Sequence, residues 1–255
     1  MMDISYLAQI VDEAALHAKA VTQLSAKHIF NEQEAYAIQA ASIARRYERG
    51  EKLIGYKLGF TSRAKMIQMG VHDMIWGRLT NTMLLEEGGN LDLKKYIHPR
   101  AEPEICYLIG KTIEHPINLL EANDYISAIA PAIEIIDSRY EKFKFSLEDV
   151  IADNCSSAGI ILGQWQSPNT VADNLGMVLE VDQRPVQVSS SAAILGNPLR
   201  SVVAAARLVT QIGEKIEAGT IIMAGAATPA IYIKAKQHIQ ARIEKIGNVG
   251  ITVAP

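Results

Sequence analysis

At Gly50 the sequence changes from helical periodicity to short segments rich in β-branched residues. Before that point, apolar residues between Ile4 and Ala15 recur at helical spacing, which predicts a first helix. A second helix is predicted from Asn31, which can form a capping box with Glu34, to Gly50. A chain with this division has to pack N-terminal helices against strands that come later in the sequence.

The part after Gly50 predicts strands, because its apolar runs are short, β-branched and bounded by Gly, Pro or Asn. These runs are KLIGYKLGF, EICYLIG, PAIEII, GIILGQW, MVLEV and TIIMAG. Helices are expected over 119–130 and 198–212, and a final hairpin is expected to turn at Gly247–Asn248. Because strands and helices alternate without a steady βαβ rhythm, the sequence predicts an α+β fold.

The length and composition allow a large buried core. The chain has 255 residues, of which 49% are hydrophobic, enough for one extended domain or a main domain with a small appendage. A weak boundary near residue 75 predicts a helical N-terminal or lid region, 1–75, and a catalytic domain, 76–255. No internal repeat or low-complexity linker interrupts either part.

Charge and termini exclude several classes of partner. The net charge is −3 and the Lys and Arg residues are scattered among acids, so the basic stripe of a nucleic-acid binder and a polybasic membrane arm are both missing. The N-terminus does not resemble a signal peptide, and no run approaches the roughly 20 apolar residues that span a bilayer. Cys106 and Cys155 are expected to be reduced, partly buried thiols. We therefore expect a cytoplasmic protein without nucleic-acid or membrane partners.

The segment His98–Ile109 carries two carboxylates on one face of a predicted strand. Period-two alternation puts Glu102 and Glu104 on the same face as Cys106 and Leu108. Two residues along a strand span roughly 6.8 Å, and at that distance two unit charges repel by about 2.4 kcal/mol if the effective dielectric is near 20. A face that continues into apolar residues is an unfavourable place for such a pair.

A third carboxylate, Glu134, lies in the run Pro131–Ile136, which is otherwise apolar on both sides. Charged residues are seldom buried unless they are paired or coordinate a metal. One hard cation bound by all three glutamates would remove the repulsion. Mg²⁺ or Mn²⁺ fits best, because these ions prefer carboxylate and water ligands and leave positions open for a substrate.

The pattern also allows a structural explanation of the three glutamates. The first two could lie on a solvated edge strand that is marked by Pro103. In that case Glu134 would pair with Arg100 or Arg139. Structural ion pairs perturb carboxylates as metal sites do, so the residue pattern alone leaves both explanations open.

A second polar segment, Gly55–Ser62, contains Lys57 between two glycines, ahead of a Thr-Ser helix cap. The ammonium and the helix N-terminus could receive an anion. The pattern alone favours the simpler interpretation, a solvated strand lysine followed by an ordinary N-cap. The turns Asp153–Gly159 and Gly225–Pro229 can offer backbone donors to a carboxylate, or they can serve only for close packing.

Together these motifs resemble the fumarylacetoacetate hydrolase superfamily. Within it they are similar to the branch that contains 2-oxopent-4-enoate hydratases and 4-oxalocrotonate decarboxylases. The resemblance runs from about residue 30 to the C-terminus and keeps order and spacing throughout. The segments that carry it are Gly55–Ser62, Arg100–Glu104, Ala132–Arg139, Asp153–Gly159 and Gly196–Pro198.

The resemblance implies a helical N-terminal part followed by a mixed β-roll. It implies that Mg²⁺ (or Mn²⁺) is held by Glu102, Glu104 and Glu134. It also implies that Lys57 is the catalytic residue, orienting a carboxylate or handling a proton after burial has lowered its pKa. The further substrate contacts that we predict are Thr61, Ile75, Trp76, Ser156 and Ser157.

Ile75 decides between the two activities of this branch. The hydratases generally place an acidic residue just before an aromatic-Gly pair, and here that position is Ile75, with Asp73 two residues away. Water addition needs a positioned acid or base, whereas loss of carbon dioxide needs an electron sink and a dry site. The resemblance therefore favours a decarboxylase acting on a small 2-oxo dicarboxylic acid, with the hydratase as the alternative.

A third possibility is a metal-free binding or scaffolding subunit. Such a subunit would not need the three glutamates and Lys57, so their presence argues against it. The resemblance further implies a homo-oligomer and a complex with the hydratase of the same pathway.

Overall fold

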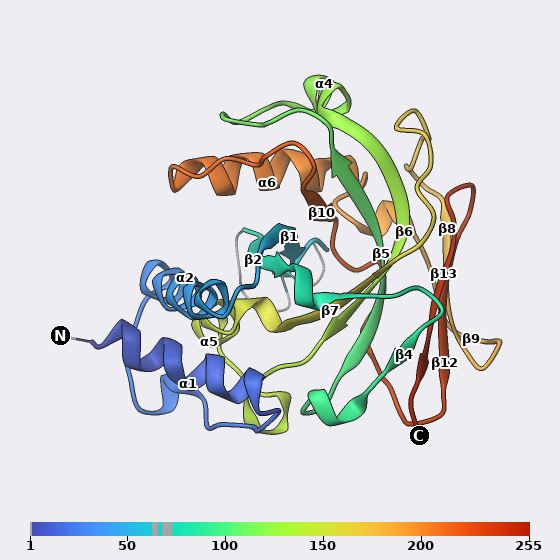
Figure 1. The fold of residues 1–255 in the computed structure, drawn as a ribbon. Coiled ribbons are helices and arrows are strands. Elements are labelled where there is room, and N and C mark those ends of the chain that lie inside the picture. The colour runs from blue at the N-terminus through green and yellow to red at the C-terminus, as the bar shows by residue number, and fades with distance from the viewer. Residues whose placement is uncertain (1, 63–65, 68–72) are drawn as a thin grey trace.

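The structure combines an N-terminal group of helices with two β-sheets (Figure 1). The computed structural model describes residues 2–62, 66–67 and 73–255. The helices are α1 Ile4–Leu16, α2 Glu32–Glu48, α4 Leu119–Ala122, α5 Leu147–Ala152 and α6 Leu199–Gln211. The strands are β1 Leu53–Gly59, β2 Ile75–Thr80, β3 Leu84–Leu85, β4 Asn90–Leu91, β5 Arg100–Ile109, β6 Ile126–Ile136, β7 Ser157–Leu162, β8 Gly176–Val181, β9 Arg184–Ser190, β10 Ile221–Met223, β11 Ile231–Tyr232, β12 His238–Ile243 and β13 Gly247–Val253.

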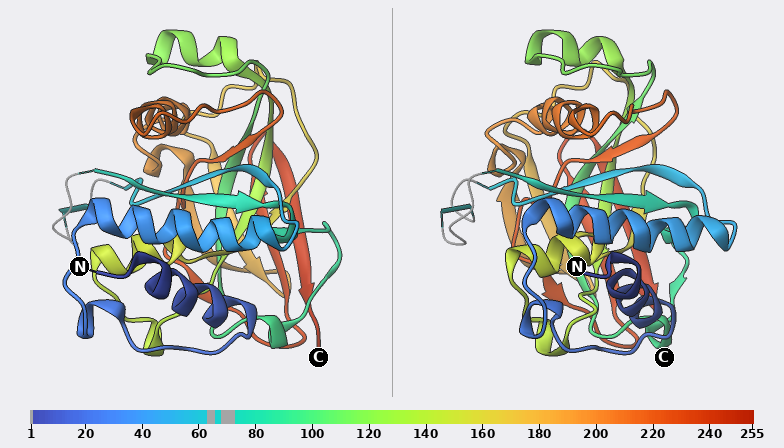
Figure 2. Two further views of the ribbon diagram at one scale, coloured as in Figure 1. Left: turned by 60° about the vertical axis from the view of Figure 1, so that its left-hand side comes forward. Right: turned by 90° about the vertical axis from the view of Figure 1, so that its left-hand side faces the viewer.

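α1 and α2 lie side by side next to the sheets (Figure 2). The predicted capping box of α2 is confirmed, because Asn31 and Glu34 each donate a backbone N–H to the other's side chain, at 2.8 and 2.9 Å. Gly50 follows the end of the helix with a φ of 92°, a conformation that glycine adopts without strain. The helix expected after the Thr-Ser cap falls largely outside the described residues.

A buried aspartate on α1 connects the two helices. Asp12 is 1% exposed, and its carboxylate accepts hydrogen bonds from Arg45 at 2.9 Å and from Arg49 at 2.6 and 2.7 Å. Burial by itself raises the pKa of Asp12, but the bonds and charges of the two arginines outweigh it and lower the pKa below the ordinary value. The carboxylate therefore stays ionised and holds α2 against α1.

The larger sheet has eight strands in the order β2-β1-β10-β5-β6-β7-β3, and β11 pairs with the start of β5. The smaller sheet has five strands in the order β4-β13-β12-β8-β9. β1 and β10 are parallel, whereas β10, β5, β6 and β7 are antiparallel neighbours. Mixed sheets preceded by helices confirm the predicted α+β fold.

The two faces of the central strands β5 and β6 have different surroundings. On one face, Ala101 of β5 and Ile133 of β6 pack against Leu179 and Ile239 of the smaller sheet. Side chains of a strand alternate between faces. Glu102 and Glu104 of β5, which the sequence predicts as metal ligands, therefore point away from the smaller sheet. The interface between the sheets thus fixes which face of β5 and β6 carries the polar side chains.

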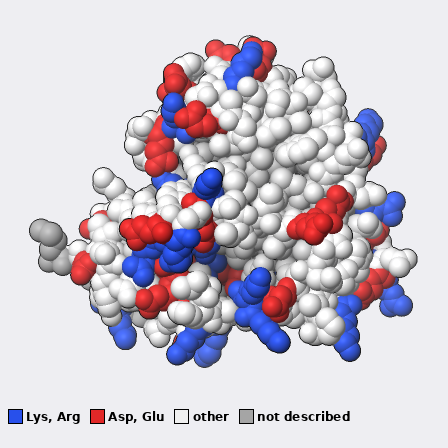
Figure 3. All heavy atoms as spheres, viewed as in Figure 1, with Lys and Arg blue, Asp and Glu red and all other residues white. Residues whose placement is uncertain are grey.

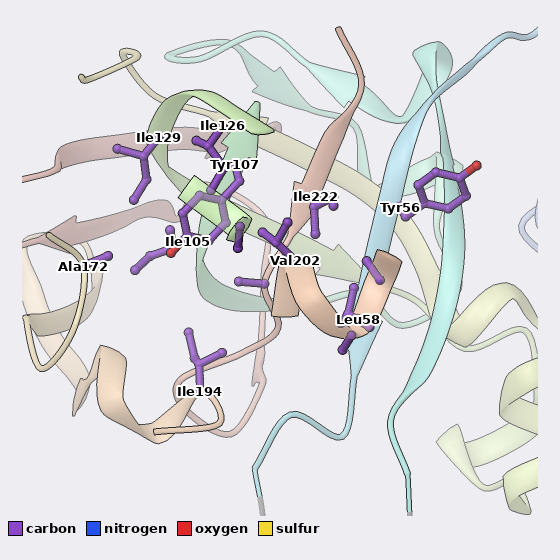
Figure 4. Packing of buried hydrophobic residues seen from close by; sticks show 14 of the residues in the cluster. Tyr56, Leu58, Ile105, Tyr107, Ile126, Ile129, Ala172, Ile194, Val202 and Ile222 are labelled. Atoms are coloured by element: carbon purple, nitrogen blue, oxygen red, sulfur yellow. The ribbon is translucent and has the colours of Figure 1, made fainter. Parts of the chain in front are cut away.

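Farther along β5, a second apolar core forms beneath α6. Ile105 and Tyr107 pack there with Ile222 of β10 and Val202 of α6 (Figure 4). The predicted helix 198–212 is confirmed as α6. This core lies at one end of the larger sheet. The predicted metal ligands lie nearer the other end, which is close to the N-terminal helices.

Two local predictions need correction. The helix expected over 119–130 ends at Ala122, and β6 starts at Ile126, because the β-branched residues that follow pair along β5. The final hairpin is present, but its turn lies at 244–246 and not at Gly247–Asn248, since Ile243 pairs with Gly247. In both places tertiary pairing determines where the strand begins.

The division at residue 75 stays a proposal. β1 comes before this boundary and pairs with β10 in the larger sheet, so the first 75 residues contribute to the sheet as well as to the helices. Acidic and basic side chains are intermixed on the face that Figure 3 shows. Within the described ranges, no helix combines the length and apolar character that crossing a membrane requires.

We predict that Asp12→Asn lowers the free energy of unfolding by about 1–2 kcal/mol at pH 7, because two guanidinium groups lose their carboxylate partner. The folded pKa of Asp12 lies below its ordinary value of 3.8, so this contribution is present above pH 3.8 and is lost as the pH falls through the folded pKa. Urea unfolding of wild type and variant should therefore converge in acid. Glu13→Gln, on an exposed neighbour, is the control and should change little; a pH-independent difference for Asp12→Asn would contradict the prediction.

Candidate metal centre and substrate cavity

Three glutamates converge on the face of β5 and β6 that points away from the smaller sheet. Glu102 and Glu104 come from β5, and Glu134 lies directly opposite Glu102 on β6. One carboxylate oxygen of each lies within 4.8 Å of the other two, and the three residues are 8%, 1% and 0% exposed. The solvated-edge alternative is therefore wrong, because β5 lies inside the sheet between β6 and β10.

Pro103 is compatible with this central position. Its carbonyl accepts a hydrogen bond from Ala227 N–H at 3.4 Å, in the segment between β10 and β11. The N–H and C=O of one strand residue point to the same side, so the N–H that proline lacks would also face this segment and not β6. The β5–β6 ladder loses no donor at Pro103, and the two glutamates beside it keep their register.

The protein compensates the three charges only in part. Gly225 N–H donates to Glu104 at 2.8 Å, whereas both carboxylate oxygens of Glu134 are buried and accept no hydrogen bond within the described part of the chain. Burial, and then the charge of Glu134, raise the pKa of Glu104 well above its ordinary value. Two unit charges at 4.8 Å repel by about 3.5 kcal/mol at an effective dielectric near 20. Three buried carboxylates that converge in this way form a donor set that suits a hard divalent cation.

Lys57 lies beside this triad. Its Nζ is 3.2 Å from the Glu134 carboxylate, and it donates to the Cys155 carbonyl at 3.2 Å. The residue is 4% exposed, so the interpretation as a solvated strand lysine is wrong. Burial lowers the pKa of Lys57, but the acidic groups around it, Glu134 above all, outweigh burial and raise the pKa above its ordinary value. The lowered pKa expected from burial alone is therefore also wrong for the metal-free protein.

Sheet register explains why Lys57 reaches the triad. Lys57 of β1 is opposite Met223 of β10, which is in turn opposite Cys106 of β5. Cys106 and Glu104 are two residues apart and share a face. All these side chains therefore point to one side of a curved sheet, and the curvature brings β1 and β6 together across it.

A left-handed turn supplies the carbonyl that Lys57 contacts. Asn154, Cys155 and Ser156 have φ values of 48°, 52° and 59°, each of which costs about 1 kcal/mol or more for a residue other than glycine. The Asn154 side chain compensates by bonding both backbone groups of Arg78 at 2.8 Å. Gly77 is required beside it, because a Cβ there would lie 2.7 Å from the Asn154 carbonyl.

Lys57 and two of the three glutamates, Glu102 and Glu104, border a cavity of about 360 Å³. Its polar wall includes Glu102, Glu104, Lys57, Thr61 and Ser156, and its apolar wall includes Phe60, Ile75, Phe145 and Val150. The Ser156 hydroxyl is buried and has no hydrogen-bond partner in the described part of the chain. A small organic acid bound here would contact both the carboxylate cluster and an apolar surface.

Of the predicted substrate contacts, Thr61, Ile75 and Ser156 line this cavity, whereas Ser157 and Trp76 do not. Ser157 is fully buried at the start of β7. Trp76 follows Ile75 on β2 and therefore points to the opposite face, where it stacks on Tyr36 with ring centroids 5.5 Å apart. Of the predicted apolar pair Ile75 and Trp76, Ile75 is thus the one that contributes to the apolar wall of the cavity.

Among the lining residues that sequence reasoning did not assign to the site are Arg100, Phe143 and Phe145. Arg100 could have been found, since it is two residues before Glu102 on the same strand and shares its face. The predicted pairs of Glu134 with Arg100 or Arg139 are not formed: Arg139 pairs with Asp153. The two phenylalanines follow β6 in a loop whose backbone carried no sequence signal.

Asp73 does not take the place of the missing acid at Ile75. Its carboxylate accepts two hydrogen bonds from Arg207, at 2.7 and 2.8 Å, and it does not line the cavity. Among the described lining residues, the only carboxylates are therefore those of Glu102 and Glu104.

A family model described as fumarylacetoacetate (FAA) hydrolase C-terminal matches residues 60–254. The chain belongs to the fumarylacetoacetate hydrolase family. A 4-oxalocrotonate decarboxylase from a Pseudomonas species is 53% identical over 251 residues, which are 98% of each chain. A 2-keto-4-pentenoate hydratase from Paraburkholderia xenovorans strain LB400 is 33% identical over 225 residues, 86% of this chain and 82% of the relative.

A solved structure shows the same fold over the whole chain. It is that of 4-oxalocrotonate decarboxylase from Pseudomonas putida G7, complexed with magnesium and adipate. The TM-score is 0.95 at 35% sequence identity, and the match covers 98% of this chain and 97% of that one. The N-terminal helices followed by mixed sheets are thus the fumarylacetoacetate hydrolase arrangement, as the resemblance implies.

In this member of the fumarylacetoacetate hydrolase family, we predict opposite effects of two glutamate substitutions on the metal-free protein. Glu104→Gln removes one repelling charge and keeps an acceptor for Gly225 N–H, so it should unfold no earlier than wild type. Glu134→Gln removes the carboxylate 3.2 Å from Lys57 and leaves a buried ammonium less compensated, so it should unfold earlier. The unfolding temperature of each variant and of the wild type is measured with a chelator present. Equal changes of the unfolding temperature in the two variants would show that Lys57 is not held by Glu134.

Proposed function

We propose that the chain catalyses the metal-dependent decarboxylation of 4-oxalocrotonate (2-oxohex-3-enedioate) to 2-hydroxypenta-2,4-dienoate and carbon dioxide. The observation that carries this proposal is the buried cluster of Glu102, Glu104, Glu134 and Lys57 beside a small cavity, whose described lining residues include no carboxylate other than Glu102 and Glu104. The relative with 53% identity, named as a 4-oxalocrotonate decarboxylase, supports it.

Mg²⁺, or Mn²⁺, fits the residues present. Glu102, Glu104 and Glu134 would hold the ion, because their oxygens converge and those of Glu134 have no hydrogen-bond donor among the described residues. When bound, such an ion supplies Lewis-acid polarisation of a 2-oxo acid. The complex of the Pseudomonas putida G7 enzyme with magnesium supports this assignment.

The reaction moves electrons along the substrate chain. The C5–C6 bond breaks and its electron pair forms the C4–C5 double bond, while the pair of the C3–C4 double bond moves to C2–C3 and that of the C2 carbonyl moves to oxygen. Carbon dioxide leaves, and the C2 oxygen takes a proton to give the dienol. Lys57, held by Glu134 and the Cys155 carbonyl, is the residue we assign to orient the oxo-acid end and to donate to that oxygen.

The apolar wall favours decarboxylation over hydration. Ile75 is 4% exposed and lines the cavity, whereas Asp73 is bound to Arg207 and does not line it. The resemblance implies that position 75 is where the hydratases carry an acid. No described lining residue is thus placed to activate water near Ile75, whereas exclusion of water assists the loss of carbon dioxide. The hydratase stays the second candidate because of the 33% identical relative.

The proposal also covers the oligomeric state, the cellular location and the partners of the protein. We infer a cytoplasmic homo-oligomer that associates with the hydratase consuming the labile dienol product. A small 2-oxo dicarboxylic acid is the substrate partner, which the adipate bound to the Pseudomonas putida G7 enzyme supports. A strictly monomeric mass in light scattering at micromolar concentrations would exclude the homo-oligomer.

The direct test is carbon dioxide release from 4-oxalocrotonate with and without magnesium. The wild type should release carbon dioxide only with the ion, and Glu102→Gln should lose activity by about 100-fold or more, because one of three ligand charges is gone. Glu217→Gln, an exposed carboxylate paired with Lys215, is the matched control and should keep full activity. Hydration of the dienoate without carbon dioxide release would favour the hydratase, and no reaction at all would favour a scaffold.

We predict that Ile75→Asp slows decarboxylation. A carboxylate on the cavity wall repels the substrate's distal carboxylate by about 1–3 kcal/mol at an effective dielectric near 20–40. Ile75→Asn has the same shape without the charge and separates repulsion from altered packing. Carbon dioxide release at saturating magnesium should be slower for the Asp variant than for the Asn variant; equal rates would mean that no substrate charge lies near position 75.

A further inference from the structure

Arg100 borders the cavity from the same strand as the triad. It begins β5, two residues before Glu102, and both residues line the cavity. Side chains at this spacing share a face, with their Cα atoms roughly 6.8 Å apart. Arg100 therefore stands at one end of a short polar wall that has the carboxylate cluster at its other end.

The guanidinium of Arg100 has no acidic partner within the described residues, although several other arginines do. Those that pair with carboxylates are Arg45 and Arg49 with Asp12, Arg46 with Glu51, Arg78 with Glu214, Arg139 with Asp153, Arg207 with Asp73 and Arg242 with Glu180. Arg100 instead lies against two rings, with its Cζ 3.7 Å from the Phe143 centroid and 4.2 Å from the Tyr232 centroid. Its positive charge at the cavity is thus uncompensated by the described part of the chain.

Most of the hydrogen-bonding capacity of Arg100 is also unused. In the part of the chain that the structure describes, it makes a single side-chain hydrogen bond, from Nη2 to the Tyr232 hydroxyl at 2.5 Å, and its buried Nε has no partner. A guanidinium has five N–H donors in one plane. Rings stacked on that plane hold its orientation and leave the donors at its edge free for a planar acceptor.

The ligand that completes such a site is a carboxylate, which a guanidinium can bind through two parallel hydrogen bonds. We propose that Arg100 binds the distal carboxylate of the substrate and so selects dicarboxylic over monocarboxylic acids, an inference that rests on the proposed function. An extended six-carbon chain is roughly 6 Å long with C–C bonds of about 1.5 Å, and Arg100, Glu102 and Glu104 all line the one cavity that would hold it. One end of the acid then lies at the carboxylate cluster and the other at Arg100.

This assignment makes Arg100 a specificity residue whose effect differs from that of the triad. The distal carboxylate is charged in the bound substrate and becomes neutral carbon dioxide as the C5–C6 bond breaks. An ion pair to Arg100 is therefore stronger in the ground state than in the transition state. Its removal raises KM without lowering kcat, whereas damage to packing would lower kcat and stability.

The test compares a dicarboxylate with a monocarboxylate of the same length. Adipate and hexanoate are titrated calorimetrically into the magnesium-loaded protein, for wild type, Arg100→Gln and Arg100→Lys. We expect wild type to bind adipate more tightly, and Arg100→Gln to weaken adipate binding by about 10- to 100-fold while leaving hexanoate unchanged. Arg100→Lys keeps the charge but not the planar pair of donors, so it should keep part of the preference.

Arg242→Gln is the matched control, because Arg242 pairs with Glu180 on the smaller sheet and should not affect either ligand. Steady-state decarboxylation by Arg100→Gln should show KM raised by a similar factor and kcat unchanged or higher. Equal loss of adipate and hexanoate binding in both Arg100 variants, or unchanged adipate binding, would overturn the inference. A wild type that prefers adipate through Arg100 but releases no carbon dioxide would instead overturn the proposed function.

Discussion

The structure depends on the burial of three like charges on two neighbouring strands. One carboxylate oxygen each of Glu102, Glu104 and Glu134 lies within 4.8 Å of the other two, and Lys57 contacts Glu134 at 3.2 Å. At such distances, and away from water, repulsion between carboxylates is too large for surface-type ion pairing to offset. We propose that these residues hold a divalent cation, which would offset the repulsion. The rest of the fold serves to maintain that arrangement.

The three glutamates can be buried because β5 and β6 have one apolar face and one polar face. Ala101 and Ile133 on one face pack against the smaller sheet, which fixes the register of the strands through apolar contact. The opposite face then has to present the alternate residues, whatever their charge. Register also places Glu134 directly across from Glu102. The stability gained between the sheets thus holds the acidic residues where isolated strands would not place them.

Different residues at the cavity are assigned to the chemical step and to the selection of the substrate. Lys57 donates a hydrogen bond to the Cys155 carbonyl in a left-handed turn. The strain of that turn is offset by two hydrogen bonds with Arg78 of β2, in which the Asn154 side chain accepts one and donates the other. Ile75 contributes an apolar surface, and Arg100 contributes a positive charge that no carboxylate of the described residues pairs with. The residues that could act on the oxo-acid end are therefore rigid and internally bonded, whereas the residue we assign to the distal end still has donors to offer.

The sequence by itself determined the local features of this protein: the capping box at Asn31, helix α6, and the shared face of Glu102 and Glu104. These follow from spacing and capping chemistry, which depend on residues close in the chain. Only the tertiary structure decided that Lys57 is buried, that Trp76 points away from the cavity and that β6 begins at Ile126. Each of those outcomes depends on which strand lies beside which, and on how far the sheet curves. Residues far apart in the sequence fix both, through packing that no short window of sequence contains.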